Sequence, residues 1–114
     1  MERRSIYPEP GSLVKLSFTP ATGRAVAGPR LALVLSAEVY HHRTPLAVVC
    51  PIAATGKGYP FEVELPSGLS VSGVVLVDHV ASIDRAARGL EVVGMAPRWV
   101  VEEARAKLAA LLGW

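Results

Sequence analysis

Two segments of this 114-residue sequence combine cationic side chains with flanking glycines, and both could bind an anionic ligand. They cover residues 19–30 and 54–61. The residues in them that could contact such a ligand are Arg24 and Arg30 in the first, and Lys57, Gly58 and Tyr59 in the second. Arginine and lysine bind phosphate, glycine allows a close backbone approach, and a tyrosine ring can stack on a base. These residue types favour a nucleic acid or an acidic peptide as the ligand, although ordinary hairpin loops can have the same composition.

Positive charge is concentrated in the first half of the chain. Residues 1–60 hold seven Lys and Arg against three Asp and Glu, a balance of +4, whereas residues 61–114 hold five against seven, a balance of −2. Several cations of the first half fall in connections between predicted strands. Basic loops on a compact scaffold attract polyanions, so this distribution supports the same class of ligand. A solvated basic surface without a ligand would give the same count.

The histidines of the chain fall in two places. His41 and His42 lie in a polar connection with no third ligand nearby, so we expect solvated side chains rather than a metal site. His79 follows Asp78 at the end of a predicted strand, and a regular strand would point the two to opposite faces. They can work as a pair only if the strand has ended there. Phosphate-binding glycine loops and the GxSxG, CxxC and HExxH patterns are missing from the sequence.

Cysteine usage and hydropathy indicate the compartment and the assembly. Cys50, the single cysteine, lies in an apolar run, so we expect a buried structural thiol. No apolar run reaches the roughly 18–20 residues needed to span a bilayer, and the N-terminal segment lacks the apolar part of a signal peptide. We therefore expect a cytoplasmic protein without membrane contact. The mean hydropathy of +0.36 is high for a small chain, which predicts a homodimer that covers apolar surface.

The sequence around these residues predicts a small, mostly β domain. A chain of 114 residues with 51% hydrophobic and 19% charged residues predicts one domain over residues 1–114 and excludes intrinsic disorder. Gly and Pro turns separate short runs with strand composition. The predicted strands are residues 13–18, 31–36, 46–52, 61–65 and 71–77. The second and third are apolar on both faces, which indicates central strands of a small closed or half-closed barrel.

The C-terminal segment alone has the pattern of a full helix. Residues 97–112 begin at a proline, carry acidic residues early and basic residues later, and are followed by a glycine. The apolar stripe at helical spacing consists of Val101, Ala104, Leu108, Leu111 and Leu112. The predicted fold class is therefore α+β but mostly β, a barrel of about five to seven strands closed by a C-terminal helix.

The order and spacing of short motifs along the chain resemble the MazF/PemK family of toxin endoribonucleases. The first group comprises Pro8-x-x-Gly11, Phe18-x-Pro20-x-x-Gly23 and Gly28-x-Arg30. The middle group comprises Pro51 and the run Lys57-Gly58-Tyr59-Pro60-Phe61-Glu62-Val63. The last group comprises Gly73-Val74-Val75-Leu76-Val77-Asp78, Val80-x-Ser82-Ile83 and Arg85-x-x-Arg88-Gly89. Together the resemblance extends over residues 8–113 with few gaps.

The resemblance implies an SH3-like plasmid-toxin barrel that forms a homodimer and cleaves single-stranded mRNA at short sequences without a metal ion or cofactor. It also implies a cognate antitoxin, whose acidic C-terminal segment occupies the RNA-binding surface. By position, Arg30 corresponds to the family's active-site arginine and Asp78 to an acidic site residue. The loop before Lys57 corresponds to the catalytic loop, in which Thr55 is the nearest hydroxyl. The expected RNA contacts are Arg24, Lys57, Gly58, Tyr59 and His79.

Metal-free RNA cleavage requires removal of the 2′-OH proton, a proton donor for the leaving 5′-oxygen, and stabilisation of the phosphorane. The nucleophile belongs to the substrate, so the products are a 2′,3′-cyclic phosphate and a 5′-OH end. Arg30 suits the stabilising role, because a guanidinium can hold two phosphate oxygens, and the resemblance also implies a proton-donor role at this position. Asp78 could accept the 2′-OH proton or orient Arg30. The hydroxyl of Thr55 and the amides of Gly56 and Lys57 could bind the non-bridging oxygens.

In two places the sequence departs from the family pattern. Ala25 stands where the first loop often carries a glutamate, and Ala53 and Ala54 stand where the catalytic Ser or Thr lies. These replacements leave open a catalytically inactive, RNA-binding member of the same fold. The terminal Leu-Leu-Gly-Trp of residues 111–114 leaves open a non-enzymatic CcdB-like gyrase poison, which should lose its toxicity when Trp114 is deleted.

Overall fold

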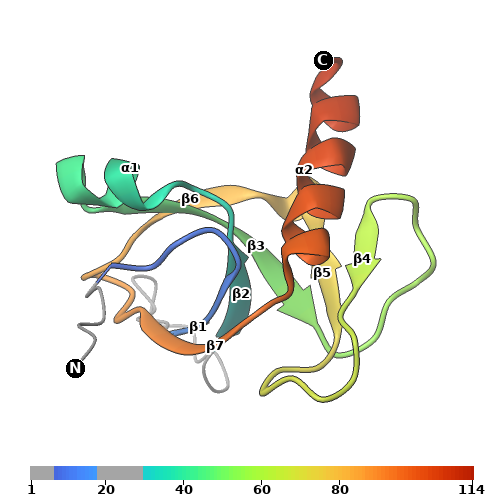
Figure 1. Ribbon diagram of the computed structural model, residues 1–114, viewed down its shortest axis with the longest axis horizontal. Helices are drawn as coiled ribbons and strands as arrows, with labels where there is room; N and C mark the ends of the chain where they lie inside the picture. The colour runs from blue at the N-terminus through green and yellow to red at the C-terminus, as the bar shows by residue number, and fades with distance from the viewer. Residues whose placement is uncertain (1–6, 18–29) are drawn as a thin grey trace, which may run out of the picture.

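The computed structural model describes residues 7–17 and 30–114. The expected RNA contact Arg24 and the replacement at Ala25 lie outside the described residues. Figure 1 shows the elements in chain order: β1 (Ser12–Leu16), β2 (Arg30–Val34), α1 (Glu38–Arg43), β3 (Leu46–Ala53), β4 (Glu62–Glu64), β5 (Val74–Leu76), η1 (Val77–His79, a 3-10 turn), β6 (Ala81–Asp84), β7 (Glu91–Met95) and α2 (Arg98–Leu112).

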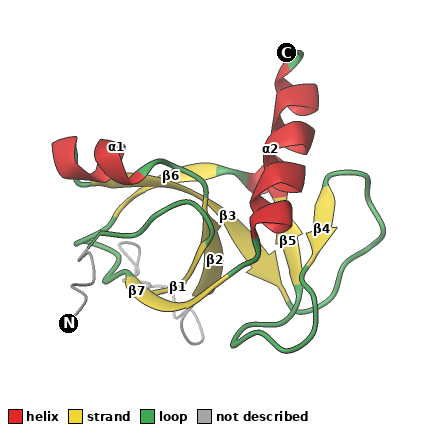
Figure 2. Ribbon diagram, in the orientation of Figure 1, coloured by secondary structure: helices red, strands yellow, loops and turns green. Residues whose placement is uncertain are grey.

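All seven strands belong to one antiparallel sheet. Its order is β4-β5-β3-β2-β1-β7, and β6 pairs with β3 on the edge that β3 also offers to β5. The sheet curves strongly (Figure 2), but in the described part of the chain no pairing joins β7 to β4. The mostly β fold with five to seven strands and a C-terminal helix is confirmed, and of the two predicted barrel forms the half-closed one is observed.

The central strands are buried on both faces, because alternate residues of a strand point to opposite sides of the sheet. One apolar cluster contains Leu13, Leu33 and Cys50, and the buried side of α2 packs into it. A second cluster on the other face contains Val14 and Val49. This double burial explains why β3 is apolar throughout its length and β2 is apolar after its exposed first residue, Arg30. Their interior position in the sheet confirms the prediction of central strands.

Helix α2 matches the predicted helix almost residue for residue. It starts after Pro97 and ends at Gly113, whose positive φ of 81° is a conformation that glycine adopts without strain. Its buried residues, Val100, Val101 and Ala104, all lie in its first half. Leu111 and Leu112 are 40% and 52% exposed, because the helix runs past the sheet and its end projects from the body (Figure 1). The predicted apolar stripe is therefore core only in its first half. Within the described ranges, no helix has the length and apolar character to cross a bilayer.

The connection after β2 differs from the prediction, because it contains helix α1 and buries one of its two histidines. His41 is 1% exposed, whereas His42 is exposed. His41 Nδ1 lies 2.8 Å from the carbonyl oxygen of Pro8, which can only accept, so this nitrogen carries the proton. Nε2 then accepts from the hydroxyl of Ser36 at 2.7 Å. The expectation of two solvated histidines is wrong for His41.

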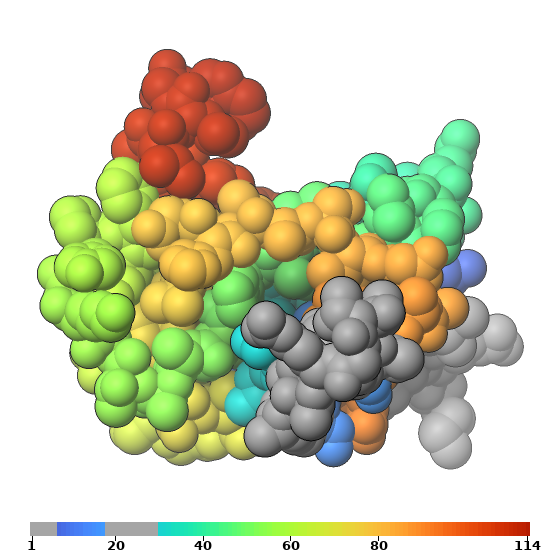
Figure 3. Space-filling model, turned by 180° about the vertical axis from the view of Figure 1, so that it is seen from behind, coloured from blue at the N-terminus to red at the C-terminus, as the bar shows by residue number. Residues whose placement is uncertain are grey.

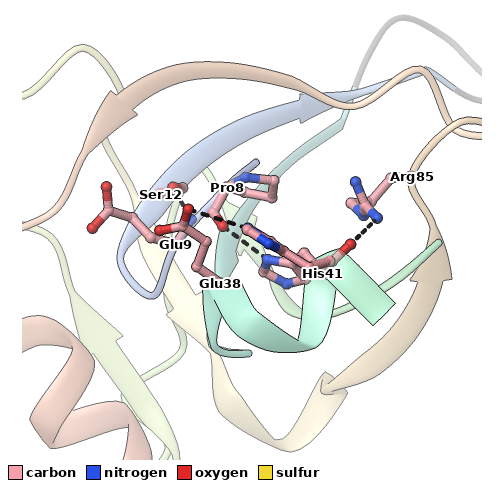
Figure 4. A network of polar contacts seen from close by, with 7 residues as sticks. Pro8, Glu9, Ser12, Glu38, His41 and Arg85 are labelled. Carbon is pink, nitrogen blue, oxygen red and sulfur yellow. Dashed lines mark hydrogen bonds and ion pairs between the residues drawn. The ribbon is translucent and has the colours of Figure 1, made fainter. Parts of the chain in front are cut away.

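Arg85 joins this polar cluster from a segment 44 residues after His41. Its Nη2 donates to the carbonyl oxygen of His41 at 2.8 Å (Figure 4). The same nitrogen donates to the carbonyl oxygen of Thr44 at 2.7 Å, at the C-terminal end of α1. Carbonyls at a helix C-terminus have no partner within the helix, and the half-buried Arg85 satisfies two of them. The guanidinium also lies 5.4 Å from the centre of the Tyr7 ring. Four residues thus hold α1 against the sheet: Pro8, Ser36, His41 and Arg85.

Candidate functional site

A cavity of about 230 Å³ opens on the face of the sheet opposite α2. It is lined by Leu16, Arg30, Leu31, Ala32, Val49, Pro51, His79, Ala81, Ile83 and Arg88. The apolar residues come mainly from the second core cluster, so the floor of the cavity is the packed interior of the sheet. Three side chains give it positive or titratable character: Arg30, His79 and Arg88. In Figure 3 this face is toward the viewer, with the start of β2 in cyan next to the green of β3 and the loop that follows it.

The cavity unites two residues that were predicted from the sequence with one that was not. Arg30 enters as the first residue of β2, and His79 from η1. Arg88 comes from the turn after β6, and its Nε donates to the carbonyl oxygen of Ser17 at 2.9 Å. The Ser17 amide in turn donates to the carbonyl of Arg88 at 2.6 Å. Arg88 belongs to the Arg85-x-x-Arg88-Gly89 motif, which was the one signal in the sequence that pointed to it.

Asp78 and His79 protrude because of a mismatch in the pairing along β3. Before the mismatch, the last pair joins Val75 of β5 to Ile52 of β3. After it, the first pair joins Ala81 of β6 to Val49 of β3. Five residues, 76–80, therefore face only two residues of β3, and the excess forms η1. The strand thus ends before Asp78, which was the condition for the two side chains to work together. His79 Nε2 lies 4.0 Å from Asp78 Oδ1, and both residues are exposed.

Cys50 lies on β3 behind this turn and is fully buried. Its burial, with a smaller contribution from the negative charge of Asp78, raises its pKa from 9.0 to about 12. At neutral pH the group is a protonated thiol without nucleophilic character. The prediction of a buried structural cysteine is confirmed.

The loop between β3 and β4 is held from behind by a carboxylate. Glu62 accepts hydrogen bonds from the amide of Lys57, at 3.1 and 3.0 Å to its two oxygens, and from the amide of Gly58 at 3.0 Å. A Cβ on Gly56 would lie only 2.5 Å from Glu62 Oε1, so a glycine lets the carboxylate reach the loop. Lys107 of α2 donates from Nζ to the carbonyls of Pro60, at 2.8 Å, and Glu62, at 3.1 Å.

These contacts change one of the hypotheses drawn from the sequence. The Lys57 amide, expected to bind a phosphate oxygen, already donates to Glu62. The side chains of Thr55, Lys57 and Tyr59 are exposed, but they do not line the cavity that contains Arg30. The predicted site residues therefore fall into two described places, the cavity with its neighbour Asp78, and the loop of residues 54–61. Glu62 and Lys107, which fix that loop, were not identified from the sequence as functional.

The chemistry open to this arrangement is binding of an anion and transfer of a proton. Two guanidinium groups at one cavity can neutralise a phosphodiester, and an imidazole beside a carboxylate can exchange protons near neutral pH. Among the residues that the structure describes, no three His, Cys, Asp or Glu side chains are grouped closely enough to hold a metal ion.

Comparison with known proteins adds relatives of the whole chain. A family model described as "PemK-like, MazF-like toxin of type II toxin-antitoxin system" matches residues 9–112. The endoribonuclease toxin MazF of Escherichia coli (strain K12) is 39% identical over 106 residues, which are 93% of this chain and 95% of that protein. The endoribonuclease toxin ChpB of the same strain is 36% identical over 110 residues, 91% of this chain and 93% of that protein.

Solved structures agree with these relatives. MazF of Deinococcus radiodurans matches with a TM-score of 0.85 at 48% identity, over 96% of this chain and 100% of that chain. A MazE–MazF structure from the same organism matches with a TM-score of 0.87 at 50% identity, over 94% of this chain and 97% of that chain. A mycobacterial endoribonuclease in complex with its cognate antitoxin has a TM-score of 0.76 at 19% identity, over 93% of this chain and 95% of that chain, a likeness of fold alone.

Proposed function

The chain belongs to the family of PemK-like, MazF-like toxins of type II toxin–antitoxin systems, as a MazF-like endoribonuclease toxin, and from this premise we propose how it acts. It cleaves single-stranded mRNA at a short sequence, without a metal ion, and leaves a 2′,3′-cyclic phosphate and a 5′-OH end. The observation that carries this proposal is the cavity in which Arg30, Arg88 and His79 converge. Two permanent cations suit the scissile phosphate, because they stabilise the charge that accumulates on the phosphorane.

The site residues take the following roles in the proposal. Arg30 contacts the scissile phosphate, and Asp78 either accepts the 2′-OH proton or orients a neighbouring group. Thr55 supplies a hydroxyl from the loop of residues 54–61. The remaining RNA contacts are Arg24, Lys57, Gly58, Tyr59 and His79. The exposed Lys57 and Tyr59 support this, because a cation and a stacking ring are what a single strand requires.

We also propose the assembly in which the chain works. Residues 1–114 form a single toxin domain that pairs as a homodimer in the cytoplasm, and a cognate antitoxin neutralises it with an acidic C-terminal segment. Two observations support the antitoxin: the relative from D. radiodurans is solved as a MazE–MazF structure, and the first half of this chain carries a balance of +4, seven cations against three acids. The exposed apolar end of α2, with Leu112 and Trp114, supports a second chain at its surface.

The experiment that tests the activity is cleavage of a long single-stranded RNA in excess EDTA, with every cut end mapped. We expect cuts at one short sequence with 5′-OH ends. Arg30→Ala should lower the rate on the order of a hundredfold or more, because a charge-stabilising group is lost. Arg43→Ala is the matched control, since Arg43 is an exposed arginine on α1 that does not line the cavity.

Two results would contradict the proposal. RNA that stays intact with a folded, dimeric protein rules out the cleavage activity and favours an inactive RNA-binding member of the fold. Equal rates for the Arg30→Ala and Arg43→Ala proteins rule out the role of Arg30 even if RNA is cut.

A further inference from the structure

His79 is the one residue of the cavity whose position depends on the mismatch along β3. If β5 continued into β6 in register, position 79 would be part of the ladder on β3. The three-residue excess instead forms η1 and brings the His79 ring to the cavity, with Arg30 from β2 and Arg88 from the turn after β6. The histidine side chain is 62% exposed, so it can meet a bound ligand.

RNA cleavage at the cavity requires a proton donor for the leaving 5′-oxygen. A guanidinium keeps its proton in proteins, so Arg30 and Arg88 can bind the phosphate but are poor general acids. Among the described residues that line the cavity, His79 is the one whose side chain can both donate and accept a proton. The charged groups that face it are Arg30, Asp78 and Arg88.

Asp78 gives the imidazole a carboxylate neighbour at 4.0 Å. A carboxylate near an imidazole can fix the orientation of the ring, because it attracts a ring N–H. The two residues lie on the same short turn, so the backbone of η1 fixes them together. Asp78 is therefore placed to hold and orient the His79 ring.

Resting on the proposed function, we infer that His79 is the general acid of RNA cleavage and that Asp78 is its positioning residue. The 2′-oxygen loses its proton to water and bonds to phosphorus. The bond from phosphorus to the 5′-oxygen breaks, and a ring N–H of the His79 imidazolium gives its proton to that oxygen. The neutral imidazole regains a proton from water, so each turnover leaves the protein unchanged.

The test uses two forms of one RNA at the mapped cut, with either oxygen or sulfur at the bridging 5′ position. A thiolate leaves without being protonated, so the sulfur substrate does not need a general acid. We expect His79→Gln to cleave the oxygen substrate about a hundredfold or more slowly than the parent protein, and the sulfur substrate at nearly the parental rate. Arg30→Ala should be slow on both substrates. His42→Gln is the matched control, since His42 is an exposed histidine 3.4 Å from the Glu38 carboxylate and away from the cavity.

Asp78 is tested in the same assay with Asp78→Asn. A positioning role predicts a lower kcat at unchanged KM on the oxygen substrate, recovery on the sulfur substrate, and partial restoration by Asp78→Glu. A role in folding alone would lower the rates on both substrates.

Each remaining outcome overturns the inference. Equal loss by His79→Gln on both substrates makes the histidine a binding residue, and no loss on either removes it from the reaction. If the parent protein cleaves RNA but His79→Gln gives either of these two results, only this inference is contradicted and the proposed function stands. A folded parent protein that cleaves neither substrate contradicts the proposed function, and the inference with it.

Discussion

Two polar clusters of the molecule contain a histidine, and they differ in where their hydrogen bonds go. The His41 cluster is made of Pro8, Ser36, His41 and Arg85. Its bonds to the backbone carbonyls of Pro8 and His41 lie between α1 and the segments packed against it (Figure 4). The His79 cluster, made of Arg30, Asp78, His79 and Arg88, surrounds a cavity. The polar atoms of the first are bonded within the protein except Arg85 Nε, which is buried without a partner in the described residues. In the second, Arg88 bonds the carbonyl of Ser17, while Arg30 and His79 line a cavity that a ligand can enter.

The comparison shows that a histidine can contribute to stability in one place and to function in another. His41 is only 1% exposed, so loss of a hydrogen-bond partner of its ring would leave a buried polar group without a hydrogen bond. The side chain of His79 is 62% exposed and water can replace whatever it contacts. Changes in the first cluster should therefore alter the free energy of unfolding, and changes in the second should alter the rate of cleavage.

The largest effect on stability should follow His41→Ala. This change removes both ring hydrogen bonds, strands the Pro8 carbonyl and leaves a cavity, so the free energy of unfolding should fall by about 3 kcal/mol. Urea denaturation measures it. His42→Ala, one residue away on the exposed side of α1, should change it by no more than about 0.5 kcal/mol. Equal effects of the two substitutions would abolish the distinction between the clusters.

The sequence predicted those features that depend on neighbours along the chain. The apolar runs located β2 and β3 to within two residues, and Pro97 with Gly113 located α2, because alternation and capping are local signals. Burial of His41 depends on Pro8, 33 residues away, so no local pattern announces it. Strands β6 and β7 were not predicted, because most of their residues are exposed and their sequences show little alternation of apolar and polar residues.

The candidate site was predicted in the same uneven way. Arg30 and Lys57 stand beside glycines and proline, which marked their loops, and the resemblance to a family marked Asp78. Arg88 reaches the cavity only because its turn bonds to Ser17, 71 residues away. The pairing of Asp78 with His79 depends on how β5 and β6 share the edge of β3, which is a property of the folded sheet.

The loop of residues 54–61 is intermediate between the His41 cluster and the His79 cluster. The backbone amides of Lys57 and Gly58 bond to Glu62 within the protein, whereas the side chains of Thr55, Lys57 and Tyr59 are exposed. Glu62→Gln keeps one acceptor oxygen but replaces the other with an amide donor that faces the Lys57 and Gly58 amides. We expect the free energy of unfolding to fall by about 1 kcal/mol and RNA binding to weaken about fivefold.

Glu64→Gln provides the matched control for this prediction. Glu64 lies two residues further along β4, is exposed, and is not bonded to the loop amides. Denaturation and RNA titration of both proteins measure the two quantities. A loss of stability in Glu62→Gln with unchanged RNA binding would make the carboxylate a purely structural group and place this loop with the His41 cluster.

The smallest effect on stability and RNA affinity should follow Lys57→Ala. This substitution tests the contribution of the Lys57 side chain alone, because the backbone amide of residue 57 is kept. The substitution keeps the amide that donates to Glu62, so the free energy of unfolding should stay within about 0.5 kcal/mol of the parent value. Loss of one phosphate contact should lower the slope of log affinity against log salt by about 0.7 for a single strand. Arg43→Ala, which removes an exposed cation on α1, should leave that slope unchanged. If the Lys57 and Arg43 variants have the same slope, the loop holds its lysine for a reason other than RNA, and the ligand-binding surface is confined to the His79 cluster.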